Sequence, residues 1–170
     1  VRSYRAADED LLLWVHIAFM DSFLRAHQMY AWREIPGGAD AYIAHWSKSV
    51  EPLGLKGVPM NRADLDAEIK RFIDGDILRV DERTRDVILF IKNPPLPGVA
   101  RIAYRLLFDA AVVSLEPEFR QMLGLRAAPR WIVQPLTRTM LKTIRWMIGP
   151  ESPIEEAGRA RLRRIGVWAD

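Results

Sequence analysis

Cysteine is absent from the 170-residue chain, and histidine occurs only three times. Without cysteine the chain has no disulfide bonds, thiolate zinc sites, iron–sulfur clusters or cysteine nucleophiles. The three histidines stand alone in the sequence, because none belongs to a His-x-x-x-His or Glu-x-x-His pair. These absences disfavour chemistry that rests on a zinc ion or a dinuclear carboxylate site.

Several other signatures are missing as well. The chain has neither a G-x-G-x-x-G nor a G-x-x-x-x-G-K-[ST] phosphate loop, and it lacks the G-x-S-x-G elbow of hydrolases. No apolar run approaches the roughly 18 residues of a membrane span, since the densest, from Leu11 to Met20, is interrupted by His16. Residues 1–7 are polar and do not resemble a signal peptide. These features favour a cytoplasmic or a membrane-peripheral location. The sequence does not decide between the two.

The composition that remains, with 49% hydrophobic and 28% charged residues, is that of one globular domain. Apolar residues recur with helical rather than strand periodicity, which predicts an all-α, single-domain helical bundle over residues 1–170. Asp8, Asp40, Asn61 and Asp81 are the expected N-caps, and Pro135 is expected to mark the first turn of a new helix. About eight helices are predicted, near residues 9–29, 40–50, 61–73, 81–91, 99–114, 116–123, 130–148 and 154–164.

The first predicted helix is apolar on nearly all sides and must therefore be central. Polar side chains on such a helix have to be paired, ligated or directed into a cavity. His16 and His27 fall on one face of it, about 20° apart in azimuth and roughly 16 Å apart along the axis, which is too far to share a metal. His16 could contact a buried cofactor, although the residues alone favour a core histidine bonded to a backbone carbonyl.

Basic residues concentrate in the C-terminal half of the chain. Arg138, Lys142 and Arg145 fall at i, i+4 and i+7 on one helix face, and further arginines cluster at residues 159–164. Such a face could bind an anionic partner, but a solvated face is the favoured interpretation. A nucleic-acid partner is not expected, because recognition motifs and interleaved aromatic residues are missing. A weaker alternative is a contact with a membrane surface through Leu162, Ile165, Val167 and Trp168.

One stretch of the sequence carries a family resemblance. The residues from Tyr4 to His16 read YRAADEDLLLWVH and are followed by an Asp-Ser-Phe-Leu segment at residues 21–24. Tyr42 and Trp46 then form a Tyr-x-x-x-Trp pattern, and the region from Leu115 to Leu125 contains Leu-Glu-Pro, Phe-Arg and Leu-Gly-Leu in order. With these motifs, the whole chain resembles the mpaB and rubber-oxygenase catalytic-domain family.

The resemblance implies an all-α domain that holds heme b in a largely apolar pocket. Members of that family use dioxygen to cleave carbon–carbon double bonds of isoprenoid chains, so the expected partners are an apolar small-molecule substrate and dioxygen. His16 is the residue carried over as a heme-pocket residue. Phe19, Met20 and Phe23 are expected to form the pocket wall, because helical spacing places them near His16.

The resemblance also implies that the iron-coordinating histidine lies in a His-x-x-x-Arg stretch upstream of residue 1. We therefore expect the chain to be the C-terminal portion of an oxygenase catalytic domain, and the 170 residues alone could be inactive. The alternative hypothesis is a non-catalytic helical module that binds an apolar ligand or a protein partner in the same cavity.

Overall fold

The computed structural model describes residues 8–75, 77–149 and 153–166. These residues contain no strand, which confirms the predicted all-α class. Residues 4–7 of the family motif, and Val167 and Trp168 of the suggested membrane contact, lie outside the described residues. The described part holds eight α-helices and one 3-10 helix, η1: α1 Glu9–Tyr30, α2 Gly38–Ser47, η1 Lys48–Leu53, α3 Arg62–Asp74, α4 Glu82–Lys92, α5 Gly98–Ser114, α6 Pro117–Met122, α7 Arg130–Ile148 and α8 Pro153–Arg164.

Three of the predicted N-caps are confirmed. The Asp8 carboxylate accepts from the Leu11 N–H, the Asn61 side chain from the Asp64 N–H, and the Asp81 carboxylate from the Thr84 N–H. Each cap satisfies a first-turn N–H that has no partner within its own helix. The sequence therefore sets the starts of α1, α3 and α4 through local side-chain chemistry.

The fourth predicted cap, Asp40, is wrong. Helix α2 begins two residues earlier at Gly38, after Gly37 in the left-handed conformation with φ of 76°, and no side chain caps it. Glycine reaches this conformation at little cost, so the chain turns into the helix without a capping carboxylate. Asp40 instead lies in the first turn of α2, where its carboxylate accepts from the Arg62 N–H at the start of α3. The predicted end near Val50 falls within η1, which continues to Leu53.

Pro135 does not begin a new helix. It lies inside α7, which runs without interruption from Arg130 to Ile148. A proline at the sixth position removes only the hydrogen bond to the carbonyl of Trp131, four residues earlier. Both residues are exposed, so water can reach that region of the helix. The loss is therefore tolerated near the N-terminal end of a long helix.

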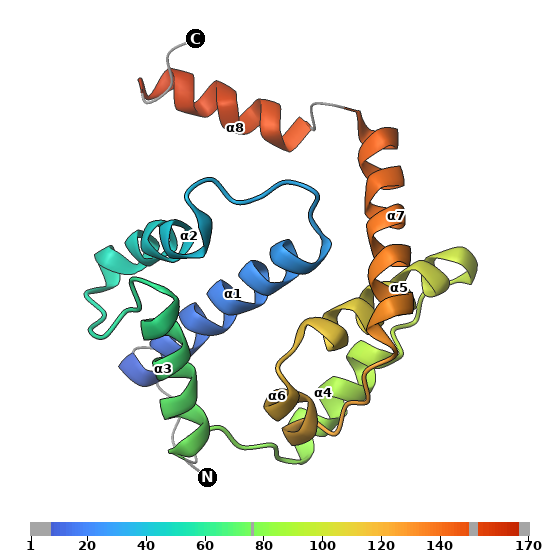
Figure 1. Cartoon of the computed structure of the whole chain (residues 1–170), viewed down its shortest axis with the longest axis horizontal. Helices are drawn as coiled ribbons and strands as arrows, with labels where there is room; N and C mark the ends of the chain where they lie inside the picture. The colour runs from blue at the N-terminus through green and yellow to red at the C-terminus, as the bar shows by residue number, and fades with distance from the viewer. Residues whose placement is uncertain (1–7, 76, 150–152, 167–170) are drawn as a thin grey trace.

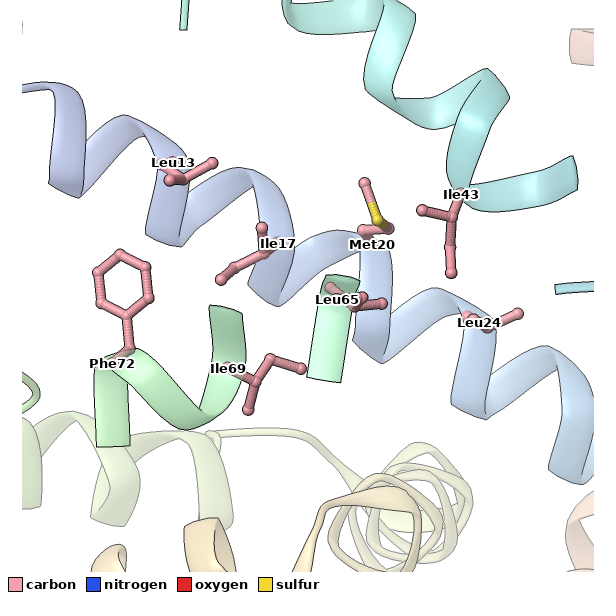
Figure 2. Packing of buried hydrophobic residues seen from close by; sticks show 8 residues of the cluster. All are labelled: Leu13, Ile17, Met20, Leu24, Ile43, Leu65, Ile69 and Phe72. Carbon is pink, nitrogen blue, oxygen red and sulfur yellow. The ribbon is translucent and has the colours of Figure 1, made fainter. Parts of the chain in front are cut away.

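Helix α1 is central, as predicted, and packs against α2, α3, α5 and α7 (Figure 1). On one side it forms the main core with α2 and α3, and Figure 2 shows these side chains converging. An apolar stripe of α3 supplies one wall of this core. Its buried members are Leu13, Ile17, Met20 and Leu24 of α1, Ile43 of α2, and Leu65, Ile69 and Phe72 of α3.

On its other side α1 meets α5 and α7 in a smaller core, formed by Tyr30, Ala110, Val113 and Val133. The Tyr30 hydroxyl donates to the Ala110 carbonyl at 2.7 Å and so fixes the end of α1 to α5. Helices α5 and α7 pack along each other and leave a space beside the C-terminal half of α1. Helix α8 lies apart from both cores (Figure 1).

Candidate functional site: an apolar groove with a cationic mouth

The residues predicted as a pocket divide between two sides of α1. Met20 is fully buried in the main core against α2 and α3. Phe19 and Phe23 lie outside that core, 54% and 52% exposed, and their rings stack with centroids 5.9 Å apart. His16 is buried and faces α2, where its ring lies 6.4 Å from that of Trp46. The four side chains therefore do not line one cavity.

His16 belongs to a small cluster of buried polar groups between α1 and α2. The Trp46 ring lies 5.7 Å from that of Tyr42 and 5.5 Å from that of Phe23. Three buried atoms of this cluster have no hydrogen-bond partner within the described part of the chain: Nε2 of His16, the hydroxyl of Tyr42 and Nε1 of Trp46. Burial lowers the pKa of His16 and raises that of Tyr42, so both side chains are neutral near pH 7.

Buried polar groups without partners are uncommon in folded proteins. Three of them in one cluster mark a place where a ligand or ordered water would gain hydrogen bonds. His16 is buried, as the core-histidine interpretation expects, but its Nε2 atom makes no hydrogen bond to a backbone carbonyl.

A groove of about 710 Å³ runs between α1, α5 and α7. Thr137, which is 1% exposed, lies in its wall and has a hydroxyl without a partner. Among the described residues that line the groove, Arg145 is the one charged side chain, so the groove suits an apolar ligand. The larger apolar side chains along it are Phe23 of α1, Trp32, Leu107 of α5, Leu115, and Leu141, Ile144 and Ile148 of α7.

The groove opens into a second, cationic space of about 970 Å³, which we call the mouth. The two spaces share His27, Tyr30, Ala31, Trp32 and Arg145. None of the described residues that line the mouth is acidic, so these residues give it a positive potential. Its cationic members are Arg33, Arg138, Lys142 and Arg145.

The predicted basic face of α7 is therefore directed at the end of α1. The Arg138 guanidinium donates to the carbonyls of Met29 at 3.1 Å and Ala31 at 3.4 Å, where α1 ends. A cation is favourable at the C-terminal end of a helix, where carbonyls lack partners. Arg138 thus holds α7 against α1 and contributes charge to the mouth, whereas Lys142 extends the same face toward solvent.

His27 lies where the groove meets the mouth. Its side chain is exposed, and its Nε2 atom lies 2.9 Å from the Arg33 carbonyl oxygen. A carbonyl can only accept, so Nε2 carries a proton and donates. In the neutral ring this leaves Nδ1 with a free electron pair.

A network of ion pairs fixes the opposite surface of α1. The Asp21 carboxylate, which is 9% exposed, accepts from Arg25 at 2.6 Å and from Arg62 of α3 at 3.0 Å. Arg25 also pairs with Glu116, next to α6. This network satisfies the buried Asp21 and ties α1 to α3 and α6, so the orientation of α1 is fixed beside the groove.

The sequence predicts these residues only in part. It identifies Phe23, His27 and the basic face of α7, because all of them follow helical spacing. It does not identify Arg33, Thr137 or the small side chains of α5 as groove residues. Their common position depends on how α1, α5 and α7 cross, for which no local pattern exists.

The oxygenase catalytic-domain family described as "ER-bound oxygenase mpaB/B'/Rubber oxygenase, catalytic domain" matches residues 1–146. The chain belongs to this family. The match includes all of α1 and α5, and α7 as far as Trp146, so it contains the helices that form the groove. No curated protein and no solved structure matches the chain. The resemblance noted from the Tyr4-to-His16 stretch is thus confirmed.

Two further features of this family member concern metals and membranes. In the described part of the chain, no three His, Asp or Glu side chains come together as a metal-binding group. None of the described helices combines the length and hydropathy needed to cross a membrane.

Proposed function

We propose that the chain is the catalytic domain, or part of the catalytic domain, of an oxygenase that binds heme b and uses dioxygen to oxidise an apolar, isoprenoid-like substrate. One observation carries the proposal. An apolar groove beside α1 leads directly into a mouth where the described lining residues include four cationic side chains and no acidic one. Family membership supports the oxygenase class.

The residues around the groove fit heme b in three respects. The apolar walls from α1, α5 and α7 suit a flat, largely apolar ring system. Arg33 and Lys142 at the mouth suit two carboxylate groups. His27 supplies an imidazole between walls and mouth. When bound, heme would supply the iron at which dioxygen is activated.

The protein's own contribution is to bind, orient and exclude water. Phe23 lines the groove and Phe19 stacks on Phe23. Met20 packs on the other side of α1, in the main core with α2 and α3, and so holds the helix in place. We propose His16 as a pocket residue that acts through Trp46 and Phe23, because its unpartnered Nε2 lies in the same aromatic cluster. Its neutral state near pH 7 lets it accept or donate one hydrogen bond.

Heme titration of the purified chain tests this proposal. We expect saturable binding with a Soret band, and weaker binding for Lys142→Ala and Arg33→Ala. Heme dimethyl ester lacks the two carboxylates, so its affinity should be the same for the parent chain and for both variants. A helical protein that includes any natural sequence upstream of residue 1 and still binds neither form of heme would falsify the heme proposal.

The non-catalytic module stays as the second candidate because many apolar side chains of α4, α5 and α7 are exposed, among them Phe90, Ile102 and Trp146. Oxygen uptake distinguishes the two functions. An oxygenase loaded with heme should consume dioxygen when given an isoprenoid such as squalene, and release carbonyl products. The assay uses the protein together with any natural sequence upstream of residue 1, because the 170 residues alone could be inactive. Binding of squalene without oxygen uptake by that heme-loaded protein would favour the module.

A further inference from the structure

Helices α4 and α5 form a hairpin that lies outside both cores at its turn. Within the described structure α4 has no buried residue and contributes none to either core. The Tyr104 hydroxyl donates to the Ile91 carbonyl at 2.6 Å, so the start of α5 is held beside the end of α4. Figure 1 shows the connection between the two helices at the edge of the molecule, away from α2 and α3. We call residues 89–105 the tip of this hairpin.

The tip exposes a group of apolar side chains. Five of them are at least 44% exposed, and Val99 and Ile102 reach 81% and 72%. Exposed apolar side chains that gather in one place mark a contact with a partner or a membrane. These five are Leu89, Phe90 and Ile91 of α4, and Val99 and Ile102 of α5.

The charges of the tip all have one sign. Residues 87–108 include no Asp or Glu, whereas Lys92, Arg101 and Arg105 are cations. None of these three forms an ion pair with another described residue. The preceding acidic residue, Asp86, is six positions from Lys92, about 9 Å along α4. Exposed apolar side chains beside unpaired cations fit an anionic bilayer, because the apolar groups enter the lipid while Lys and Arg reach the phosphates.

The backbone of the connection between α4 and α5 also suits a poorly hydrated environment. Three of its five residues, 93–97, are prolines and have no N–H. The Asn93 N–H donates to the Leu89 carbonyl at 3.1 Å, and the Leu96 N–H donates to the Pro94 carbonyl at 2.7 Å. Every N–H of the connection is therefore absent or already bonded, which lowers the cost of moving this turn toward lipid.

We infer that the tip docks on the surface of an anionic lipid bilayer. This inference goes beyond the proposed function and does not rest on it, since it involves neither heme nor the mouth. Helix α5 then connects the bilayer to the groove, because Leu107, Ala110 and Ala111 of the same helix line the groove. Ile102 and Leu107 are five positions apart, about 8 Å along the axis. An apolar substrate dissolved in the bilayer would therefore have a short path to the groove.

Vesicle binding tests the inference, with protein that includes any natural sequence upstream of residue 1. Vesicles of phosphatidylcholine mixed with phosphatidylglycerol should co-sediment the protein, and vesicles of phosphatidylcholine alone should do so more weakly. Ile102→Glu should lower the partition coefficient about tenfold, because it replaces a buried apolar contact by a charge. Lys92→Gln should lower it about fivefold, the contribution of one cation at an anionic surface.

Two substitutions outside the tip are the matched controls. Leu53→Glu changes an apolar side chain that is 58% exposed, and Lys56→Gln removes an exposed cation near it. Neither should change the partition coefficient. Circular dichroism should show the same helix content for all four variants, because each replaces an exposed residue.

A fluorescent reporter gives a signal that does not depend on a loss. The 170 residues contain no cysteine, so Phe90→Cys provides a labelling site at the tip, with any upstream cysteine replaced by serine. The emission of an environment-sensitive dye on this thiol should shift to the blue when the mixed vesicles are added. The same dye on Leu53→Cys should show no shift.

Three results would overturn the inference. The first is equal vesicle binding by the parent protein and Ile102→Glu, with no blue shift at position 90. The second is loss of binding in Ile165→Glu alone, which would assign the membrane contact to the exposed end of α8. The third is a dimer, seen by light scattering without vesicles, that Ile102→Glu dissociates, because a second copy then covers the tip. Heme titration remains an independent test of the proposed function in each case.

Discussion

The two sides of α1 differ in how completely they are covered. Toward α2 and α3, eight buried apolar residues meet in one continuous core. Toward α5 and α7, a core of four residues lies next to an apolar groove of about 710 Å³. One helix thus anchors the fold with Ile17 and Leu24 and forms a binding surface with Phe23 and His27. We therefore expect substitutions on the α2 and α3 side of α1 to change mainly stability, and substitutions on the α5 and α7 side to change mainly ligand binding.

The largest effect should come from the closed side. Phe72 is fully buried, with its ring 5.1 Å from that of Trp14, so Phe72→Ala should lower the free energy of unfolding by about 3–5 kcal/mol. Ile144→Ala, in the wall of the groove, should cost less than about 1 kcal/mol, because Ile144 is already 37% exposed. Urea unfolding measures both values. Equal losses would show that the two sides contribute alike to stability.

The ion pairs around Asp21 should give the next largest effect. Asp21→Asn keeps the shape of the side chain but leaves Arg25 and Arg62 without their shared charge, and we expect a loss of about 1–3 kcal/mol. Asp66→Asn removes an exposed partner of Arg62 and should cost below about 1 kcal/mol. A smaller loss for Asp21→Asn than for Asp66→Asn in urea unfolding would contradict the assigned role of the network.

Filling the groove should affect binding without affecting the fold. Ala111 lines the groove from α5 and is exposed, so Ala111→Trp should weaken heme binding about tenfold, which is 1.4 kcal/mol. Ala100→Trp places the same side chain on α5 away from the groove and serves as the control. Titrations followed at the Soret band give both affinities, and unchanged affinity in Ala111→Trp would place the heme elsewhere.

Acid should weaken the packing between α1 and α2 through His16. Burial lowers the pKa of His16 below its ordinary value of 6.5, so the unfolded chain binds a proton first as the pH falls. The contribution of His16 to stability is therefore greatest above pH 6.5 and decreases as the pH falls through its folded pKa. We expect His16→Gln to flatten this part of the stability profile between pH 7.5 and 5, whereas His45→Gln should leave the slope unchanged.

The smallest effect is expected at the surface. Arg71 pairs with Glu68 and Asp10, and its guanidinium lies 4.3 Å from the centroid of the Phe72 ring. The Arg71 side chain is 42% exposed and both ion pairs lie at the surface, so Arg71→Ala should cost only about 0.5 kcal/mol in urea unfolding. This loss should shrink in 1 M salt, because exposed charges are screened. A loss that is independent of salt would assign the effect to packing on Phe72.

Local signals in the sequence predicted much of the helical layout. The caps at Asp8, Asn61 and Asp81 were correct, since each depends on a side chain and an N–H three residues away. Asp40 failed as a cap because the preceding glycines turn the chain earlier and because Arg62, distant in sequence, offers its N–H. Pro135 failed as a helix start because its lost hydrogen bond lies near an exposed helix end.

The sequence by itself determined that the protein is helical, that α1 is central and that the chain belongs to an oxygenase family. Helical periodicity and motif spacing can be recognised from residues that lie near one another along the chain. Only the tertiary structure decided that Met20 lies in the core while Phe23 lines a groove, and that Arg138 and Lys142 gather near His27. The physical reason is the crossing of α1, α5 and α7. It sets which faces are buried and which charges meet, and contacts about a hundred residues apart along the chain, such as Arg138 with Met29, have no local signature.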